Sequence, residues 1–91
     1  MLRVILAWIV ILNTSTTTLS DAMLVVEDEA IELGNIGIGE SRRGEIEDVE
    51  SVRVVFRLRD EWIGTYMLPM RDTIRIDDNT ETFEVEVEFF E

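Results

Sequence analysis

The chain has 91 residues with 20 Asp and Glu, eight basic residues that are all Arg, and no Cys or His. This length allows one domain at most, and the missing Cys and His exclude a disulfide framework and a Cys/His zinc site. The net charge of −12 opposes binding to nucleic acid or to an anionic membrane. Because the usual bases and nucleophiles His, Cys and Lys are missing, the composition predicts a protein that is no enzyme and needs no cofactor.

The first twelve residues, MLRVILAWIVIL, carry a single charge and are rich in β-branched side chains. As a helix they would span roughly 18 Å, short of the ~30 Å hydrocarbon core, so no transmembrane span is predicted. As a strand they would be apolar on both faces, and a domain this small has little surface with which to cover both. We therefore predict that a partner covers one face, and that it binds Leu2, Val4, Leu6, Trp8, Val10 and Leu12.

Residues 13–22, NTSTTTLSDA, are rich in Thr and Ser and predict a linker between the hydrophobic segment 1–12 and a domain over 23–91. Such a linker would let segment 1–12 leave its own domain and dock on a neighbouring subunit, as an added strand or in an apolar groove. This interpretation predicts a non-catalytic structural subunit that forms a homo-oligomer or joins other subunits, as in a virion shell, a tail or a surface filament.

A signal peptide is the alternative interpretation of the same segment. Arg3 precedes an apolar stretch over 4–12, and the small residues at 20–22 offer a cleavage site that would leave a chain starting at Met23. The product would be an exported, extracellular or cell-surface domain. The Asn-Thr-Ser sequence at 13–15 matches the N-glycosylation acceptor pattern, which matters only for an exported chain.

From residue 23 on, short alternating runs separated by Gly and acidic turns predict β-structure. Expected strands cover 23–27, 30–33, 52–59, 62–68, 73–76 and 82–91, with turns at the glycines of 34–39, at 60–61 and at 77–80. The clearest alternation places Val52, Val54, Phe56 and Leu58 on one face. No segment has an apolar stripe at helical spacing. The predicted fold class is therefore all-β, a small antiparallel β-sandwich, immunoglobulin-like or jelly-roll-like.

Three groups of side chains in this domain are candidates for binding. Asp77, Asp78 and Glu81 supply oxygen ligands of the kind that Ca²⁺ uses, without EF-hand spacing, and a solvated turn is the alternative. Trp62, Tyr66 and Met67 form either an exposed patch or part of the core.

The third group is the row Glu84, Glu86 and Glu88 on one face of the last expected strand. Carboxylates roughly 6.6 Å apart could imitate a nucleic-acid backbone and inhibit a nucleic-acid-binding protein. They could equally pair with a row of opposite charge, formed by Arg53, Arg57 and Arg59, and the sequence favours this ladder. An acidic composition without Lys also resembles that of proteins from salt-loving (halophilic) microbes, and codon bias toward Arg is the alternative explanation.

Overall fold

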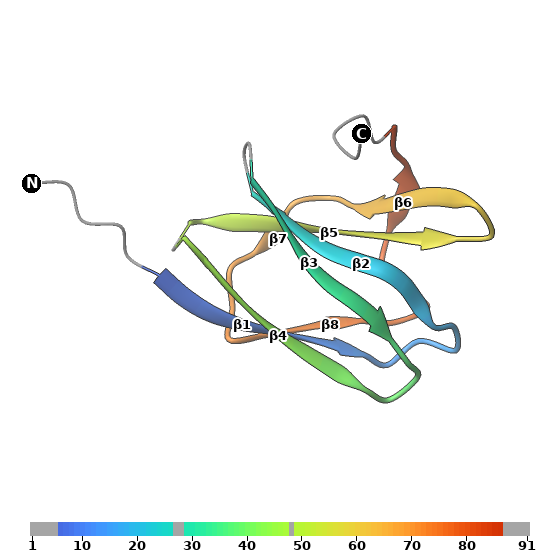
Figure 1. Ribbon diagram of the computed structural model, residues 1–91, viewed down its shortest axis with the longest axis horizontal. Coiled ribbons are helices and arrows are strands. Elements are labelled where there is room, and N and C mark those ends of the chain that lie inside the picture. The colour runs from blue at the N-terminus through green and yellow to red at the C-terminus, as the bar shows by residue number, and fades with distance from the viewer. Residues whose placement is uncertain (1–5, 27–28, 48, 87–91) are drawn as a thin grey trace, which may run out of the picture.

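The computed structural model describes residues 6–26, 29–47 and 49–86 (Figure 1). These residues form strands joined by turns, and none of them is helical. In chain order the strands are β1 (Leu6–Asn13), β2 (Leu19–Val26), β3 (Glu29–Ile36), β4 (Ser41–Glu47), β5 (Ser51–Leu58), β6 (Glu61–Thr65), β7 (Leu68–Pro69), β8 (Thr73–Ile76) and β9 (Thr82–Glu84).

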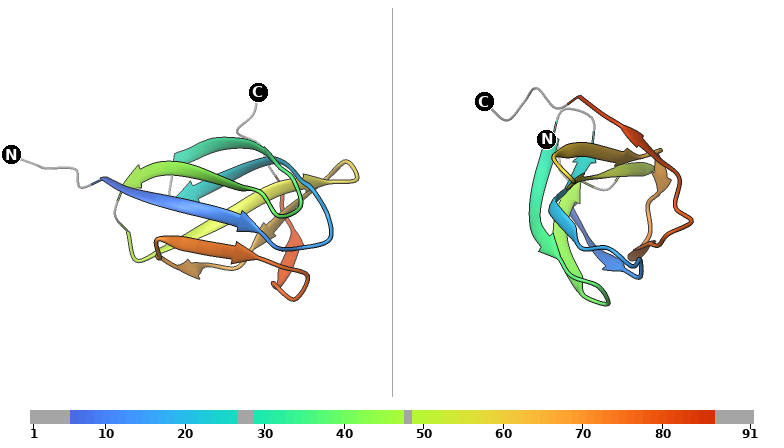
Figure 2. Two further views of the ribbon diagram at one scale, coloured as in Figure 1. Left: turned by 90° about the horizontal axis from the view of Figure 1, so that it is seen from below. Right: turned by 90° about the vertical axis from the view of Figure 1, so that its right-hand side faces the viewer.

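Two packed sheets make up the fold. The smaller sheet has the order β4-β1-β8, and the larger one has the order β3-β2-β5-β6-β9, with β7 pairing with β5. Seen end-on, the strands curve around a single interior (Figure 2). This arrangement confirms the predicted all-β class, a small β-sandwich. Both sheets contribute to the core, whose buried members are Ile9, Ile11, Leu19, Ala22, Leu24, Val26, Ile36, Ile46, Val52, Val54, Phe56, Ile74 and Ile76.

The hydrophobic segment near the N-terminus is the middle strand of the smaller sheet. β1 pairs with β4 along Leu6–Leu12 and with β8 along Val10–Asn13. Its odd-numbered face is covered by the larger sheet, so that Ile9 and Ile11 are fully buried. The prediction that this segment leaves its domain and docks as an added strand is therefore wrong. The second sheet of the sandwich covers one apolar face of β1, and the other apolar face points outward.

The pairing of β1 with β8 is parallel, whereas the sequence predicted an antiparallel sandwich. The other strand pairs of the described residues are antiparallel. A tight hairpin forces neighbouring strands to run in opposite directions. No hairpin joins β1 to β8, because six strands lie between them in the chain, and β8 can return in the direction of β1.

β2 begins at Leu19, so the stretch predicted as a linker over 13–22 is shorter than expected. Leu19 and Ala22 both face the core, although strict alternation would put them on opposite faces. An irregularity between them restores the pattern: the register shifts there, and Asp21 has a φ of 49°. The Asp21 N–H donates to Asn35 Oδ1 at 3.0 Å, which stabilises the bulge from the neighbouring strand.

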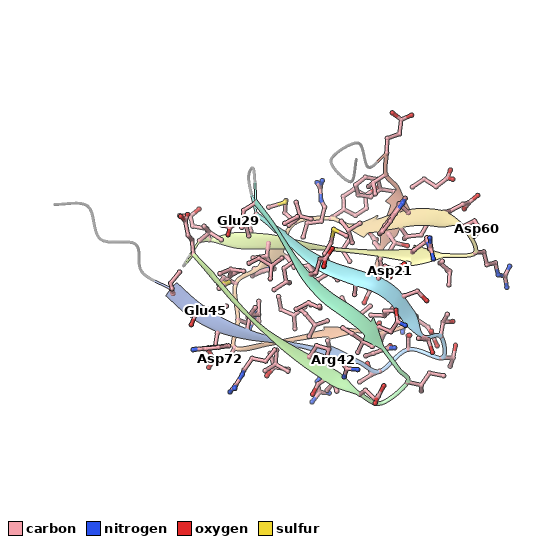
Figure 3. All side chains as sticks on the ribbon, in the orientation of Figure 1. Asp21, Glu29, Arg42, Glu45, Asp60 and Asp72 are labelled. Carbon is pink, nitrogen blue, oxygen red and sulfur yellow. The ribbon has the colours of Figure 1, made fainter. Side chains whose placement is uncertain are left out.

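The turn between β5 and β6 lies at Arg59 and Asp60, one residue earlier than predicted. Leu58 pairs with Glu61, and both turn residues have positive φ, 53° and 66°. Two-residue hairpins favour this left-handed geometry because it matches the twist of the strands, even without the usual Asn-Gly. Asp60 lies at the tip of this hairpin (Figure 3).

Asn13 closes one end of the sandwich. Its side chain is fully buried, and Nδ2 donates to the carbonyl oxygens of Thr17 (2.9 Å), Ile36 (2.9 Å) and Gly37 (3.2 Å). Its Oδ1 accepts hydrogen bonds from the backbone N–H and the hydroxyl of Ser15, at 3.0 and 2.6 Å. One amide thus ties the end of β1 to the β1–β2 connection and to the end of β3.

Candidate assembly surface

The outward face of β1 is apolar and lies on the outside of the smaller sheet. It consists of Leu6, Trp8, Val10 and Leu12, which we call the β1 stripe. Leu6 and Trp8 expose 53% and 55% of their surface, whereas the other two are half-buried. Alternate residues of a strand share a face, so the four side chains form one continuous row. The two other residues predicted to bind a partner, Leu2 and Val4, lie outside the described residues.

Polar and charged side chains flank the β1 stripe on both sides. From β4, Glu47, Glu45, Arg43 and Ser41 lie opposite Leu6, Trp8, Val10 and Leu12, in that order. From β8, Thr73 and Arg75 lie opposite Val10 and Leu12. All six flanking residues are exposed. Glu45 is marked on β4 in Figure 3, beside β1. An apolar centre within a polar rim is the usual composition of a protein–protein interface.

Arg43 holds Trp8 in place. Its guanidinium carbon lies 4.5 Å from the centroid of the indole ring, which is cation–π geometry. This contact restrains the ring while half of it faces solvent, which lowers the side-chain entropy that is lost when a partner covers it. Trp8 is thus pre-organised for contact.

The Arg–Glu ladder predicted on the larger sheet does not form. β6 lies between β5 and β9, so the two rows are two strands, or about 10 Å, apart. They also lie on opposite faces: Glu84 shares a face with Ile63 on the core side, whereas Phe83 lies on the outer face, its ring centroid 5.4 Å from the guanidinium carbon of Arg53. Arg57 instead pairs with Asp21 at 3.2 Å. Glu88 lies outside the described residues, which leaves Glu84 and Glu86 of the predicted row, both exposed.

Trp62, Tyr66 and Met67, the aromatic and Met residues singled out in the sequence, differ in exposure. Tyr66 and Met67 are about half exposed, and the Tyr66 ring lies 4.8 Å from that of Phe83. Trp62 is half-buried and lines a separate depression of about 300 Å³ on the larger sheet. The depression is formed by Asp21, Ala22, Met23, Glu32, Gly34 and Trp62. One of its two carboxylates, that of Asp21, is already paired with Arg57.

Two of the candidate calcium ligands, Asp77 and Asp78, accept hydrogen bonds from backbone and hydroxyl groups. Asp77 Oδ1 accepts hydrogen bonds from the Asn79 N–H and the Thr80 hydroxyl, at 2.8 and 3.2 Å. Asp78 Oδ1 accepts from the N–H and hydroxyl of Thr16, at 3.0 and 3.2 Å. Within 6–26, 29–47 and 49–86 no group of three acidic side chains is placed so that it could hold a metal ion, and Glu81 does not join the other two.

The glycosylation pattern and the cleavage site considered in the sequence both fall on residues that belong to the sandwich. Asn13 is the acceptor in the glycosylation pattern, but its Nδ2 is buried and donates to three carbonyl groups, so no glycan fits there. Cleavage after Ala22 would remove all of β1 and half of β2. The sandwich therefore needs the residues that a signal peptidase would take away.

Comparison of the chain with protein-family models, with curated proteins and with solved structures finds no match. The described part of the chain contains no helix of the length and hydrophobicity that crossing a membrane requires.

Proposed function

We propose that this protein is a non-catalytic structural subunit that joins a larger assembly through the β1 stripe. Such a role is typical of repeating structures such as virion shells and surface filaments. The observation that carries the proposal is the continuous apolar row in the middle of an outward sheet face, half exposed at Leu6 and Trp8. Single exposed apolar residues are ordinary on protein surfaces, but a contiguous row within a polar rim marks a binding face.

The free energy available from this row is large enough to matter. A Trp side chain has up to about 250 Å² of surface, so covering the exposed half of Trp8 would stabilise a complex by about 3 kcal/mol before ordering costs. Trp and Arg are the residues that most often dominate binding energy at the centre of interfaces. Trp8 and Arg43 supply that pair here, in contact with each other.

The mode of docking proposed for β1 differs from the added strand expected from the sequence. Added-strand docking uses free backbone hydrogen-bonding groups, and from Val10 to Leu12 β1 is paired on both sides, with β4 and with β8. The partner instead packs on side chains, face to face, as the two layers of a sandwich do. The residues involved remain those of the predicted binding face.

Radical footprinting of Trp8 tests the proposal without assuming a partner. The purified chain at low concentration and the same chain inside the producing cells are exposed to hydroxyl radicals, and oxidation is measured by mass spectrometry. Tyr66 is the matched control, because it is an aromatic side chain with 54% exposure on another part of the surface. We expect Trp8 to be protected at least fivefold in cells while Tyr66 is not. Equal oxidation of Trp8 in both settings would refute the proposal.

A further inference from the structure

The charges beside the β1 stripe are graded along the strand. At the Leu6 end, Glu47 and Glu45 lie on β4, while at the Leu12 end Arg43 lies on β4 and Arg75 on β8. Two negative charges are therefore followed by two positive charges along one face. Although the chain has a net charge of −12, the four charges beside the β1 stripe balance.

We infer that the partner seated on the β1 stripe is a second copy of this chain, related by a twofold axis that sets the two β1 strands antiparallel. The inference rests on the proposed function and names the occupant of that surface. A twofold contact is self-complementary, because each residue faces a counterpart on an identical surface. The graded charges supply that complementarity.

Two twofold arrangements keep the strands of the two packed sheets aligned, and the charges distinguish them. If the axis runs across the strands between Trp8 and Val10, β4 lies over its counterpart, and Glu45 faces Arg43 of the second copy. The reciprocal pair forms at the same time. If the axis runs along β1, β4 lies over β8, and Arg43 comes close to Arg75 of the second copy. Like charges in such a contact weaken binding, so the antiparallel arrangement is selected.

The contact is small. A strand of eight residues is about 26 Å long and three strands are about 14 Å wide, so the face covers less than half of the roughly 800 Å² that each partner buries in a stable complex. The dimer is therefore weak, with a Kd in the micromolar to millimolar range. Weak contacts of this kind hold a repeating assembly when each subunit makes several of them.

Charge reversal tests the arrangement by analytical ultracentrifugation at about 0.15 M salt. Glu45→Arg places two positive charges opposite two others, and Arg43→Glu places four negative charges together. We expect each variant to self-associate at least tenfold more weakly than the wild type. An equal mixture of the two should form a heterodimer at least as tight as the wild-type dimer, and the double variant with both changes should dimerise again.

Glu32→Arg is the matched control, because it makes the same charge change at an exposed position on the larger sheet. It reduces the net negative charge as Glu45→Arg does, so general repulsion alone would strengthen association in both variants. We expect only Glu45→Arg to weaken it, with circular dichroism showing that every variant is folded.

Three outcomes would overturn the inference. They are a wild type that stays monomeric at about 1 mM, single variants that associate as the wild type does, and a mixture that fails to form the heterodimer. In each case the footprint of Trp8 in cells decides the proposed function separately. Protection of Trp8 together with a monomeric wild type would mean that the surface binds another protein.

Discussion

Replacing Asn13 by Asp removes the two N–H hydrogens that Asn13 shares among three carbonyl oxygens, while the size of the side chain is unchanged. The carbonyl of Ile36, at 2.9 Å, is buried, and those of Thr17 and Gly37 are partly so. An ionised carboxylate at this position would place an oxygen atom against these carbonyl oxygens, where no hydrogen bond can form. The variant Asn13→Asp therefore tests whether this amide holds the end of the sandwich together.

The expected loss is a large part of the total stability. Two lost hydrogen bonds cost about 2 kcal/mol, and a buried carboxylate, with one oxygen bonded to Ser15 and the other facing carbonyl oxygens, costs about another 3 kcal/mol. A domain of this length has a free energy of unfolding of about 5–14 kcal/mol. With a urea m-value of about 1.5 kcal/mol/M, the unfolding midpoint should fall by about 3 M.

The penalty should also depend on pH. Burial among carbonyl groups raises the pKa of the introduced carboxyl above its value in the unfolded chain. Below the unfolded pKa the group is protonated in both states and keeps one donor, so the deficit relative to the wild type is smallest there. It grows as the pH rises from the unfolded pKa to the folded pKa.

Urea unfolding followed by Trp fluorescence measures both effects. Asn35→Asp is the control, since the Asn35 side chain is exposed and acts through Oδ1, an acceptor that a carboxylate retains. The control adds the same charge and should change stability by less than about 0.5 kcal/mol. If Asn13→Asp and Asn35→Asp unfold at the same urea concentration, the role assigned to Asn13 is wrong.

Three further predictions concern stability. Thr65→Val should lower the free energy of unfolding by about 1–3 kcal/mol, because Thr65 is fully buried and its Oγ1 accepts a hydrogen bond from the Val54 N–H at 3.1 Å. The control Thr18→Val, at an exposed position, should change it little in the same urea titration. Changing turn 59–60 to Asn-Gly should raise the thermal midpoint, because both positions have positive φ; an unchanged or lower midpoint would contradict this. Deleting 1–22 should leave a chain without cooperative unfolding in calorimetry, and the intact mass of the native protein should show that the segment is retained.

The sequence was most informative where one face alone meets the core. In β5, Val52, Val54 and Phe56 face the core and Arg53 and Arg57 face outward, so its orientation could be predicted from period-two hydrophobicity. β9 alternates just as clearly, yet Phe83 lies on the outer face of its sheet. Alternation defines two faces without indicating which one is inside, and in a short edge strand the register with its neighbour decides.

Part of the candidate surface could be predicted from the sequence. Composition showed that β1 is apolar on both faces, and therefore that one face would be left for a partner. The sequence did not show that β1 is held within its own domain, because this depends on pairing with β4 and β8, far away in the chain. The role of Asn13 was out of reach of the sequence, since its carbonyl partners at 36 and 37 come close only when β3 is in place.

The parallel pairing of β1 with β8 has a consequence for synthesis in the cell. Thr73, the strand neighbour of Val10, is made some sixty residues after it. At translation speeds of about 5–20 residues per second, β1 waits roughly 3–12 s for that neighbour. During this interval its apolar side chains and unpaired backbone groups are open to chaperones or to misfolded pairing between nascent chains. The smaller sheet should therefore close only late in, or after, translation, which gives this small domain an order of folding imposed by its topology.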